Sequence, residues 1–413
     1  MLFGNSGVFM SINNIDEALQ RISELADKFS GTYPDRDRNN EYPRQEMDEL
    51  KQSGLLGFSI PPGYGGLGAN CTEITEAIIT LSQGNPSIGQ MFLVHCLLGA
   101  SFLDELAPEP LKKKVFEDIL TNNVFLGNAA SEKTNDPKKG YDLSFTPVDG
   151  GYEISGKKFF STGSLAGDKI AVIGMLDKTM ALGIVPSDAP GLEIRDDWDA
   201  MGQRGTGSGT TIFDKVFAPS DMVMASITDA SRQMAVTNLL GPITQIGFTG
   251  IFIGAATGAM AAATQYIRET TRAYPWPGLD FDKAVDDPYI LVQMGDLSAR
   301  LAAAEALTYA AARKVDVALE ARATASADEM AQLRGEASVA VSQAKIVATE
   351  TGLKVCQDIL VSCGARSALR EQNLDRFWRD IRTLTLHDPI SFRVRSVGEY
   401  VLQGKLPTPA LRY

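Results

Sequence analysis

The chain has 413 residues, of which 44% are hydrophobic and 22% are charged, and its formal net charge is −12 at pH 7. This length predicts two or three domains, and the composition is that of a folded globular protein. The acidic balance argues against a nucleic-acid-binding protein, which would need a basic face.

Cysteine and histidine are scarce in this chain. The four cysteines form no CxxC pair and are too few for a disulfide framework, which predicts a reducing, cytoplasmic location. Since there are only two histidines, the usual ligands of a transition-metal site are missing, and we expect no metal. The N-terminus, MLFGNSG, lacks the basic start and the long apolar run of a secretory signal.

Residues 1–125 predict an N-terminal helical domain. Ile15, Leu19, Ile22 and Leu25 recur at helical spacing, and the same pattern returns at 74–81. Between these two stretches the string PPGYGGLG at 61–68 predicts a loop.

Residues 126–230 predict a middle β domain. Two glycines within 148–154 indicate a hairpin connection, and short apolar runs at 170–175, 181–185 and 210–213 predict strands. The string GTGSG at 205–209 precedes a strand, whereas a dinucleotide fingerprint opens a helix. We therefore interpret it as a turn and expect no nicotinamide site.

Residues 231–413 predict a C-terminal helical bundle, because apolar residues follow helical spacing around 297–311 and 339–348. Residues 233–267 carry no charge, and their glycines at 250, 254 and 258 have the spacing of membrane helix pairs. Asn238, Pro242 and Gln245 interrupt this run, which favours a buried helix of a soluble protein over a membrane span.

Two groups of residues could carry chemistry. His95 lies in an apolar helical run, and His387 follows a charged string; such residues are commonly core histidines, but histidine is also the natural proton donor near neutral pH. The strings GNAASE at 127–132 and FFSTG at 159–163 bracket the start of the β domain. Their hydroxyl and amide groups would suit a flat polar heterocycle such as a flavin.

These strings, taken together, resemble the acyl-CoA dehydrogenase superfamily along essentially the whole chain. The landmarks, in order, are PGYGGLG at 62–68, SE at 131–132, GKKFFSTG at 156–163 and RD at 379–380. The resemblance implies an α+β fold with an N-terminal helical domain, a middle β domain and a C-terminal four-helix bundle. It also implies a homotetramer.

Within this superfamily the chain most resembles the reduced-flavin monooxygenases that oxidise dibenzothiophene. The likeness lies in short strings such as DDW at 196–198, GQR at 202–204 and DDPY at 286–289, and in the run FWRDIRTLTLHDP at 377–389. It implies a two-component enzyme that receives reduced FMN from a separate NAD(P)H:flavin reductase. The enzyme would insert oxygen from O2 through a flavin C4a-hydroperoxide, at the sulfur of an aromatic or organosulfur compound such as dibenzothiophene. The string SCGAR at 362–366 replaces a Gly-Gly-x-Gly loop that holds FAD, which favours FMN.

The resemblance also assigns roles to individual residues. It implies that Thr162 contacts flavin N5 or the peroxide, that His387 activates oxygen and moves a proton, and that His95 lines the pocket. The other expected flavin contacts come from several parts of the chain. Contacts with the ring are expected from Asn128, Ser131 and Ser161, with Trp198 beside it, and contacts with the phosphate from Arg272 and Arg366. Arg272 could serve the flavin of a neighbouring subunit.

Two other functions stay open at this point. An FAD-dependent acyl-CoA dehydrogenase, or an enzyme like nitroalkane oxidase, would use Asp388 as its base. A protein with the same fold that has lost its chemistry would serve as a scaffold. The substrate is open as well, because dibenzothiophene monooxygenases have a histidine where this chain has Leu384. Thiophenes, sulfones, phenols and indoles are all compatible with the sequence.

Overall fold

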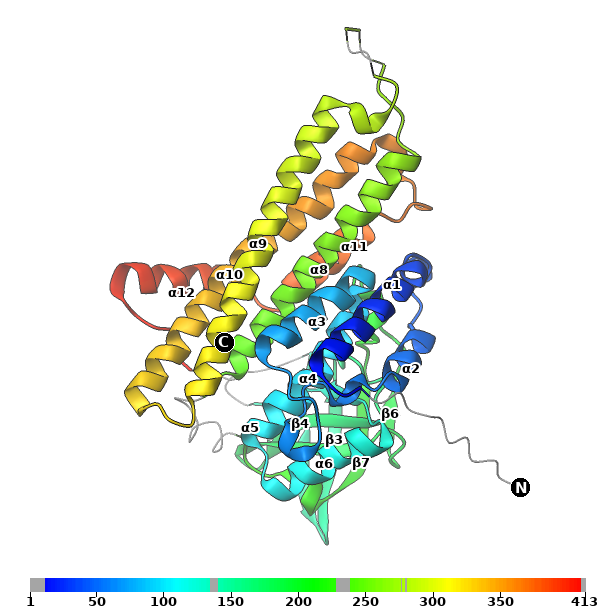
Figure 1. Cartoon of the computed structure of the whole chain (residues 1–413). Coiled ribbons are helices and arrows are strands. Elements are labelled where there is room, and N and C mark those ends of the chain that lie inside the picture. The colour runs from blue at the N-terminus through cyan, green and yellow to red at the C-terminus, as the bar shows by residue number, and fades with distance from the viewer. Residues whose placement is uncertain (1–11, 134–139, 228–237, 276, 279–280, 410–413) are drawn as a thin grey trace, which may run out of the picture.

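The computed structural model describes residues 12–133, 140–227, 238–275, 277–278 and 281–409. Figure 1 shows three parts in space: a sheet domain, a set of shorter helices above it, and a bundle of long helices at the other end. The N-terminal helices lie between the sheet and the bundle, so they contact both.

The N-terminal part is helical, as predicted. Its helices are α1 (Ile15–Asn39), α2 (Arg44–Gln52), α3 (Cys71–Gly84), α4 (Pro86–Cys96), α5 (Asp104–Leu106) and α6 (Glu109–Asn122). Helix α3 begins with a capping box: the Asn70 side chain accepts from the Glu73 N–H, and the Glu73 carboxylate accepts from the Asn70 N–H. Residues 61–68 form the predicted loop, with Gly65 at φ 96° and Gly68 at φ 70°.

The middle part is a single sheet of eight strands. They are β1 (Leu126–Ala129), β2 (Ser144–Val148), β3 (Gly151–Lys158), β4 (Lys169–Leu176), β5 (Thr179–Pro186), β6 (Leu192–Ile194), β7 (Thr211–Pro219) and β8 (Val223–Met224). The order is β6-β7-β3-β2-β4-β5-β8, and β1 pairs with β4 in parallel. The predicted hairpin joins β2 to β3 through Gly150, whose φ is 75°.

The C-terminal part is helical. Its helices are α8 (Leu240–Glu269), α9 (Pro288–Ala321), α10 (Ala327–Cys363), α11 (Arg376–Thr385) and α12 (Ile390–Gln403). The glycines of α8 let it approach α3 closely. A Cβ on Gly254 would lie 2.3 Å from the carbonyl oxygen of Ile79, and one on Gly258 would lie 2.5 Å from that of Gln83. The small-residue spacing therefore serves packing within the protein.

Two helices, Pro86–Leu106 and Leu240–Glu269, are long and apolar enough to cross a membrane by length and composition. In this structure 81% and 78% of their apolar windows are buried inside the protein. Burial of this extent is typical of core helices, which pass the same test.

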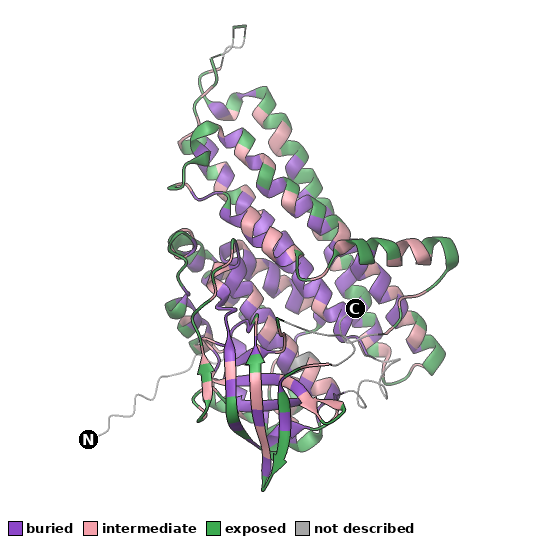
Figure 2. Cartoon of the chain, turned by 180° about the vertical axis from the view of Figure 1, so that it is seen from behind, coloured by how far each residue is buried: buried purple, intermediate pink, exposed green. Residues whose placement is uncertain are grey.

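One hydrophobic cluster joins the N-terminal helices to the bundle, and a second cluster lies between the strands. Figure 2 shows the corresponding buried residues running through the helices and into the end of the sheet that lies beside them. The opposite end of the sheet is mostly exposed. The predicted fold class is confirmed: helical domain, β domain and helical bundle follow one another along the chain.

Candidate active site

The two strings expected to hold a flavin ring lie side by side. The Asn128 N–H donates to the carbonyl of Thr162 at 3.1 Å, and the Phe159 N–H donates to the carbonyl of Ser131 at 2.8 Å. The Ser164 hydroxyl donates to the carbonyl of Asn128 at 3.0 Å. The two segments run antiparallel to each other, since Ser131 and Phe159 form an antiparallel bridge. The structure thus brings Asn128, Ser131, Ser161 and Thr162 together.

The turn that carries Thr162 has an unusual backbone. Phe160 has φ 55° and Gly163 has φ 75°, so the chain bends sharply on both sides of Ser161 and Thr162. The bend leaves the ring of Phe160 exposed, edge-on to Trp198 with ring centroids 5.7 Å apart. Trp198 is fixed by its indole N–H, which donates to the carbonyl of Gln203 at 2.9 Å. Two aromatic rings therefore stand beside the predicted flavin contacts.

A buried ion pair holds the two strings at a constant spacing. Lys158 Nζ lies 2.6 Å from Glu132 Oε1 and 3.1 Å from the carbonyl oxygen of Ala130. Burial alone would raise the pKa of Glu132, but hydrogen bonds from Lys158 and from the N–H groups of Asp142 and Leu143 lower it. The pair is thus charged and fully bonded, which offsets the cost of its desolvation.

Polar groups behind the turn fit a polar ligand. The hydroxyl of Ser161 is buried and has no hydrogen-bond partner among the described residues. Thr162 is also buried, and its hydroxyl contacts that of Ser208 at 2.8 Å. A buried hydroxyl left without a partner has an energetic cost that a ligand would remove. The donor and acceptor set of this turn therefore fits the polar edge of a flavin.

His95 lies one layer behind this turn. Its Nε2 contacts the carbonyl oxygen of Leu56 at 3.0 Å, its Nδ1 accepts from the Leu126 N–H at 3.1 Å, and its ring stacks on Phe125. A Cβ on Gly163 would lie 3.3 Å from the Phe125 ring, so that ring separates His95 from the Thr162 turn. Burial lowers the pKa of His95 to about 4.

These contacts place the His95 side chain inside this chain, and the expectation that it lines the pocket stays a prediction. His95 is 1% exposed, and both of its ring nitrogens form hydrogen bonds with backbone groups. The geometry is that of a core histidine held neutral with its proton on Nε2. A catalytic role for His95 stays a prediction that this arrangement does not favour.

His387 follows α11, and its side chain lies against α8 of the helical bundle. Its ring lies against Phe248 of α8 with centroids 4.6 Å apart, and its side chain is 52% exposed. The Nδ1 atom lies 3.4 Å from Asp388 Oδ1. Since a carboxylate accepts, we assign a proton to His387 Nδ1, which donates to Asp388. Nε2 is then the nitrogen available for proton exchange.

Asp388 is held by a cluster of side chains from three helices. Lys345 of α10 and Arg393 of α12 form ion pairs with its two carboxylate oxygens, and the Lys345 ammonium also donates to Gln245 of α8. We call Gln245, Lys345, Asp388 and Arg393 the Asp388 cluster. Burial would raise the pKa of Asp388, but the hydrogen bond from His387 and the charges of Lys345 and Arg393 hold that pKa well below its ordinary range.

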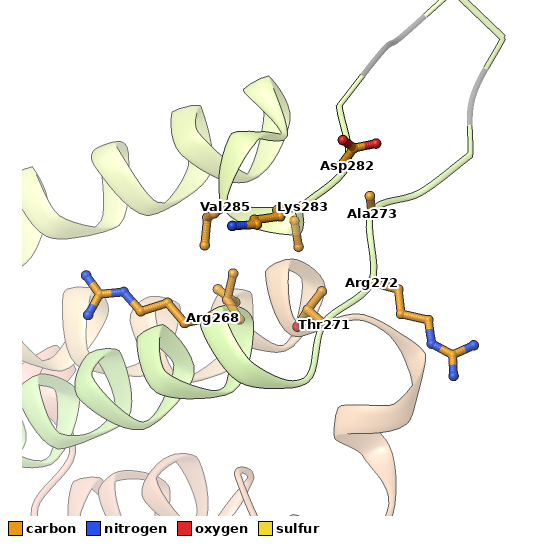
Figure 3. A pocket seen from close by; sticks show the side chains of 9 residues that line it. Arg268, Thr271, Arg272, Ala273, Asp282, Lys283 and Val285 are labelled. Atoms are coloured by element: carbon orange, nitrogen blue, oxygen red, sulfur yellow. The ribbon is translucent and has the colours of Figure 1, made fainter.

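The two arginines expected at the FMN phosphate lie near the C-terminal end of α8. Arg366 and Arg272 are exposed, and the guanidinium of Arg366 donates to the carbonyl of Thr270 at the end of α8. Arg272 is one of the residues that line a hollow of about 340 Å³ at this end of α8, and in Figure 3 its guanidinium points outward from that hollow. In Figure 1 this end of α8 is opposite the sheet domain. Within one chain, these arginines and the Thr162 turn are therefore not brought together.

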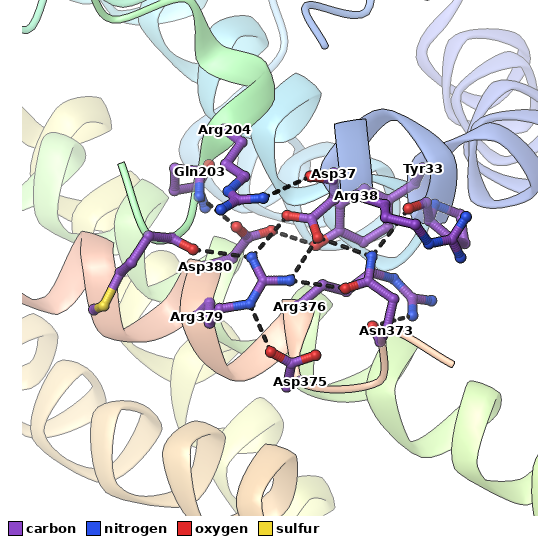
Figure 4. A network of polar contacts seen from close by, with 12 residues as sticks. Tyr33, Asp37, Arg38, Gln203, Arg204, Asn373, Asp375, Arg376, Arg379 and Asp380 are labelled. Atoms are coloured by element: carbon purple, nitrogen blue, oxygen red, sulfur yellow. Dashed lines mark hydrogen bonds and ion pairs between the residues drawn. The ribbon is translucent and has the colours of Figure 1, made fainter. Parts of the chain in front are cut away.

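A third polar network joins α1, the loop after Trp198 and α11 (Figure 4). Arg379 forms two hydrogen bonds with the Asp37 carboxylate and donates to the carbonyl of Met201 at 2.9 Å. Asp380 accepts from the Tyr33 hydroxyl and from the Gln203 N–H, and burial raises its pKa to about 7. The family landmark RD thus connects all three parts of the chain.

Sequence reasoning did not identify Lys345, Arg393, Ser208 or Thr206 as parts of a site. For Lys345 a signal existed: it shares a helix face with Val341 and Ala348, where a charged residue without a partner would be costly. Thr206 and Ser208 lie in the glycine-rich string that we interpret as a turn. Nothing in that string indicates which hydroxyls point inward.

Comparisons with known proteins agree along the whole chain. The family models of the acyl-CoA dehydrogenase N-terminal, middle and C-terminal domains match residues 17–123, 132–216 and 246–392. Dibenzothiophene monooxygenase from Mycolicibacterium goodii is 33% identical over 403 residues, which cover 95% of each chain. TdsC from Paenibacillus sp. A11-2, solved with FMN and indole, has a TM-score of 0.87 at 33% identity and covers 96% of this chain and 100% of its own. Methanesulfinate monooxygenase MsuC from Pseudomonas fluorescens has a TM-score of 0.86 at 30% identity, with 96% and 99% covered.

Proposed function

The chain belongs to the acyl-CoA dehydrogenase family, and within that family we propose that it is an FMNH2-dependent monooxygenase. It transfers one oxygen atom of O2 to a small substrate, and it uses FMN rather than FAD. The observation that carries this proposal is the state of Asp388. The residue expected to act as a dehydrogenase base is an anion bound by Lys345 and Arg393, whereas Nε2 of the neighbouring His387 has no hydrogen-bond partner among the described residues.

FMN, when bound in its reduced form, supplies the electrons that activate O2. The residues of this chain then have three tasks. Asn128, Ser131 and Ser161 bind the ring, with Trp198 beside it, and Thr162 contacts the ring near N5. His387 exchanges a proton at Nε2 as the O–O bond breaks. The third task is to keep water from the site, because water would otherwise divert the reaction to hydrogen peroxide.

We propose an aromatic or organosulfur compound as the substrate. The names of the related proteins support this class, since they include dibenzothiophene and methanesulfinate monooxygenases. Leu384, which is buried, makes the region before His387 less polar than a second histidine would. This difference favours an apolar ring system over a small charged sulfinate.

The reduced FMN is proposed to come from a separate NAD(P)H:flavin reductase in the cytoplasm, where the four free cysteines would stay reduced. We also propose a homotetramer. Exposed apolar side chains on two helices of the bundle support assembly with further copies: they are Tyr289, Leu291 and Val292 on α9 and Val401 and Leu402 on α12.

The test uses purified protein, a generic flavin reductase, FMN, NADH and O2. Thiophenes, sulfones, phenols and indoles are supplied in turn, and oxygenated product and hydrogen peroxide are measured together. We expect product from at least one class, and we expect His387→Ala to lose product while oxygen consumption continues as peroxide release. Unchanged product formation by this variant would remove His387 from the mechanism.

The dehydrogenase alternative is tested separately. Oxidised protein loaded with flavin is mixed with acyl-CoAs without oxygen, and the flavin absorbance is followed. We expect no bleaching, because Asp388 lacks a free carboxylate oxygen to abstract a proton. Bleaching by any acyl-CoA would contradict the monooxygenase proposal.

A further inference from the structure

Three buried hydroxyls form a chain behind the proposed flavin contact. The Thr162 and Ser208 oxygens are 2.8 Å apart, the Ser208 and Thr206 oxygens are 2.7 Å apart, and the Thr206 hydroxyl donates to the carbonyl oxygen of Gln203 at 2.8 Å. Thr206 is fully buried, and Thr162 and Ser208 are nearly so. Water therefore does not compete for these bonds.

The Gln203 carbonyl, at the end of this row of hydroxyls, sets the direction of every hydrogen bond in the row. A carbonyl oxygen can only accept, so the single hydroxyl proton of Thr206 points to Gln203. Thr206 must then accept from Ser208, and Ser208, whose own proton is used, must accept from Thr162. The proton of Thr162 is therefore directed away from the flavin, and only the lone pairs of its oxygen remain for a ligand.

From this polarity we infer that Thr162 acts as a hydrogen-bond acceptor toward the flavin, and that Thr206 and Ser208 are positioning residues that make the site select reduced over oxidised FMN. Reduced flavin carries a hydrogen on N5 and donates there, whereas oxidised flavin presents a lone pair at N5. The inference rests on the proposed function, since it takes from it the contact between Thr162 and N5.

Oxidised FMN could bind only with a mismatch or with the chain reversed. Reversal makes Thr206 donate to Ser208, which breaks its bond to Gln203. The Gln203 carbonyl would still accept from the Trp198 indole, so the loss is one buried hydrogen bond. One such bond corresponds to roughly a two- to tenfold difference in affinity. For a two-electron couple, a tenfold difference corresponds to about 30 mV in the midpoint potential of bound FMN.

The experiment measures the dissociation constants of oxidised and reduced FMN without oxygen, together with the midpoint potential of bound FMN. The variants are Thr206→Val and Ser208→Ala, each of which frees the Thr162 proton. Neither residue touches the flavin in this proposal. Thr308→Val is the matched control, because Thr308 is a fully buried threonine in α9 whose hydroxyl donates to the Ala304 carbonyl, also at 2.8 Å.

We expect the wild type and Thr308→Val to bind reduced FMN two- to tenfold more tightly than oxidised FMN, and both chain variants to lose this preference. The double variant should lose no more of the preference for reduced FMN than either single variant, because all of them interrupt the same row of hydroxyls. Equal affinities in the wild type, or a preference that both chain variants retain, would overturn the inference. Should Thr206→Val not fold, Ser208→Ala decides alone. If the wild type binds neither form of FMN, the proposed function fails instead.

Discussion

The neutral ring of His95 should make stability depend on pH. Its pKa is about 4 in the folded protein, against 6.5 for an ordinary histidine. Below pH 6.5 His95 takes up a proton in the unfolded chain but stays neutral in the folded protein. The free energy of unfolding therefore falls as the pH falls from about 6.5 to 4, and then levels off. A shift of this size corresponds to about 3 kcal/mol.

Urea unfolding of the wild type and of His95→Gln between pH 4 and 7.5 measures this contribution. Glutamine can still donate to Leu56 and accept from the Leu126 N–H, but it does not titrate. We expect the variant to lack the His95 part of the acid destabilisation, so that its free energy of unfolding approaches or passes that of the wild type at low pH. Parallel pH profiles would show that His95 is not held neutral.

The sequence predicted some residues of the candidate site, and physical reasons separate them from the rest. Asn128, Ser131 and Thr162 lie in short strings beside strands, so pairing of neighbouring segments brings them together. Lys345 and Asp388 are 43 positions apart, and their contact depends on how α10 packs against the turn after α11. Periodicity fixes which face of a helix is buried, but it does not fix which partner that face meets.

Among the elements, α10 carries a buried ammonium group that stabilises its packing against neighbouring helices. Lys345 is 3% exposed and is paired with Asp388, and the cluster connects α10 to α8 and α12. Lys345→Met keeps most of the side-chain volume but leaves the buried carboxylate with fewer partners. We expect a loss of about 3 kcal/mol in the free energy of unfolding, since breaking a buried ion pair leaves an uncompensated charge.

Lys354→Met is the control for this prediction. Lys354 lies on the same helix and pairs with Asp358, but it is 45% exposed. Pairs of this kind contribute about 0.3–0.5 kcal/mol, so the control should unfold almost as the wild type does. Equal losses from the two variants in urea titrations would mean that the Asp388 cluster has no special structural importance.

The elements themselves were predicted better than their pairing. Helical spacing anticipated α1, α3, α9 and α10, and turn glycines anticipated the β2–β3 hairpin. The pairing of β3 with β7 joins residues about 60 positions apart along the chain, for example Gly156 with Phe213. Such pairing follows from long-range packing, which local patterns do not encode, whereas the order of the three domains was predicted from local patterns and agreed with the family resemblance.

At the scale of the whole molecule, the two halves of the proposed FMN site are apart. The Thr162 turn lies at the sheet, while Arg272 and Arg366 lie at the opposite end of α8 (Figure 1). One bound FMN can therefore contact both only if the arginines come from another copy of the chain. The exposed apolar side chains near the start of α9 offer a surface on which that copy could pack.

A mixing experiment tests this arrangement. Arg272→Ala keeps the ring contacts but lacks the phosphate contact, and Thr162→Val has the opposite defect. Each variant alone should lose most product formation. If sites are shared between paired subunits, equal co-expression gives half mixed pairs, each with one intact site of two, so activity should recover to about a quarter of the wild type. Mixed oligomers with no more activity than the two variants measured separately would show that each chain builds its FMN site alone.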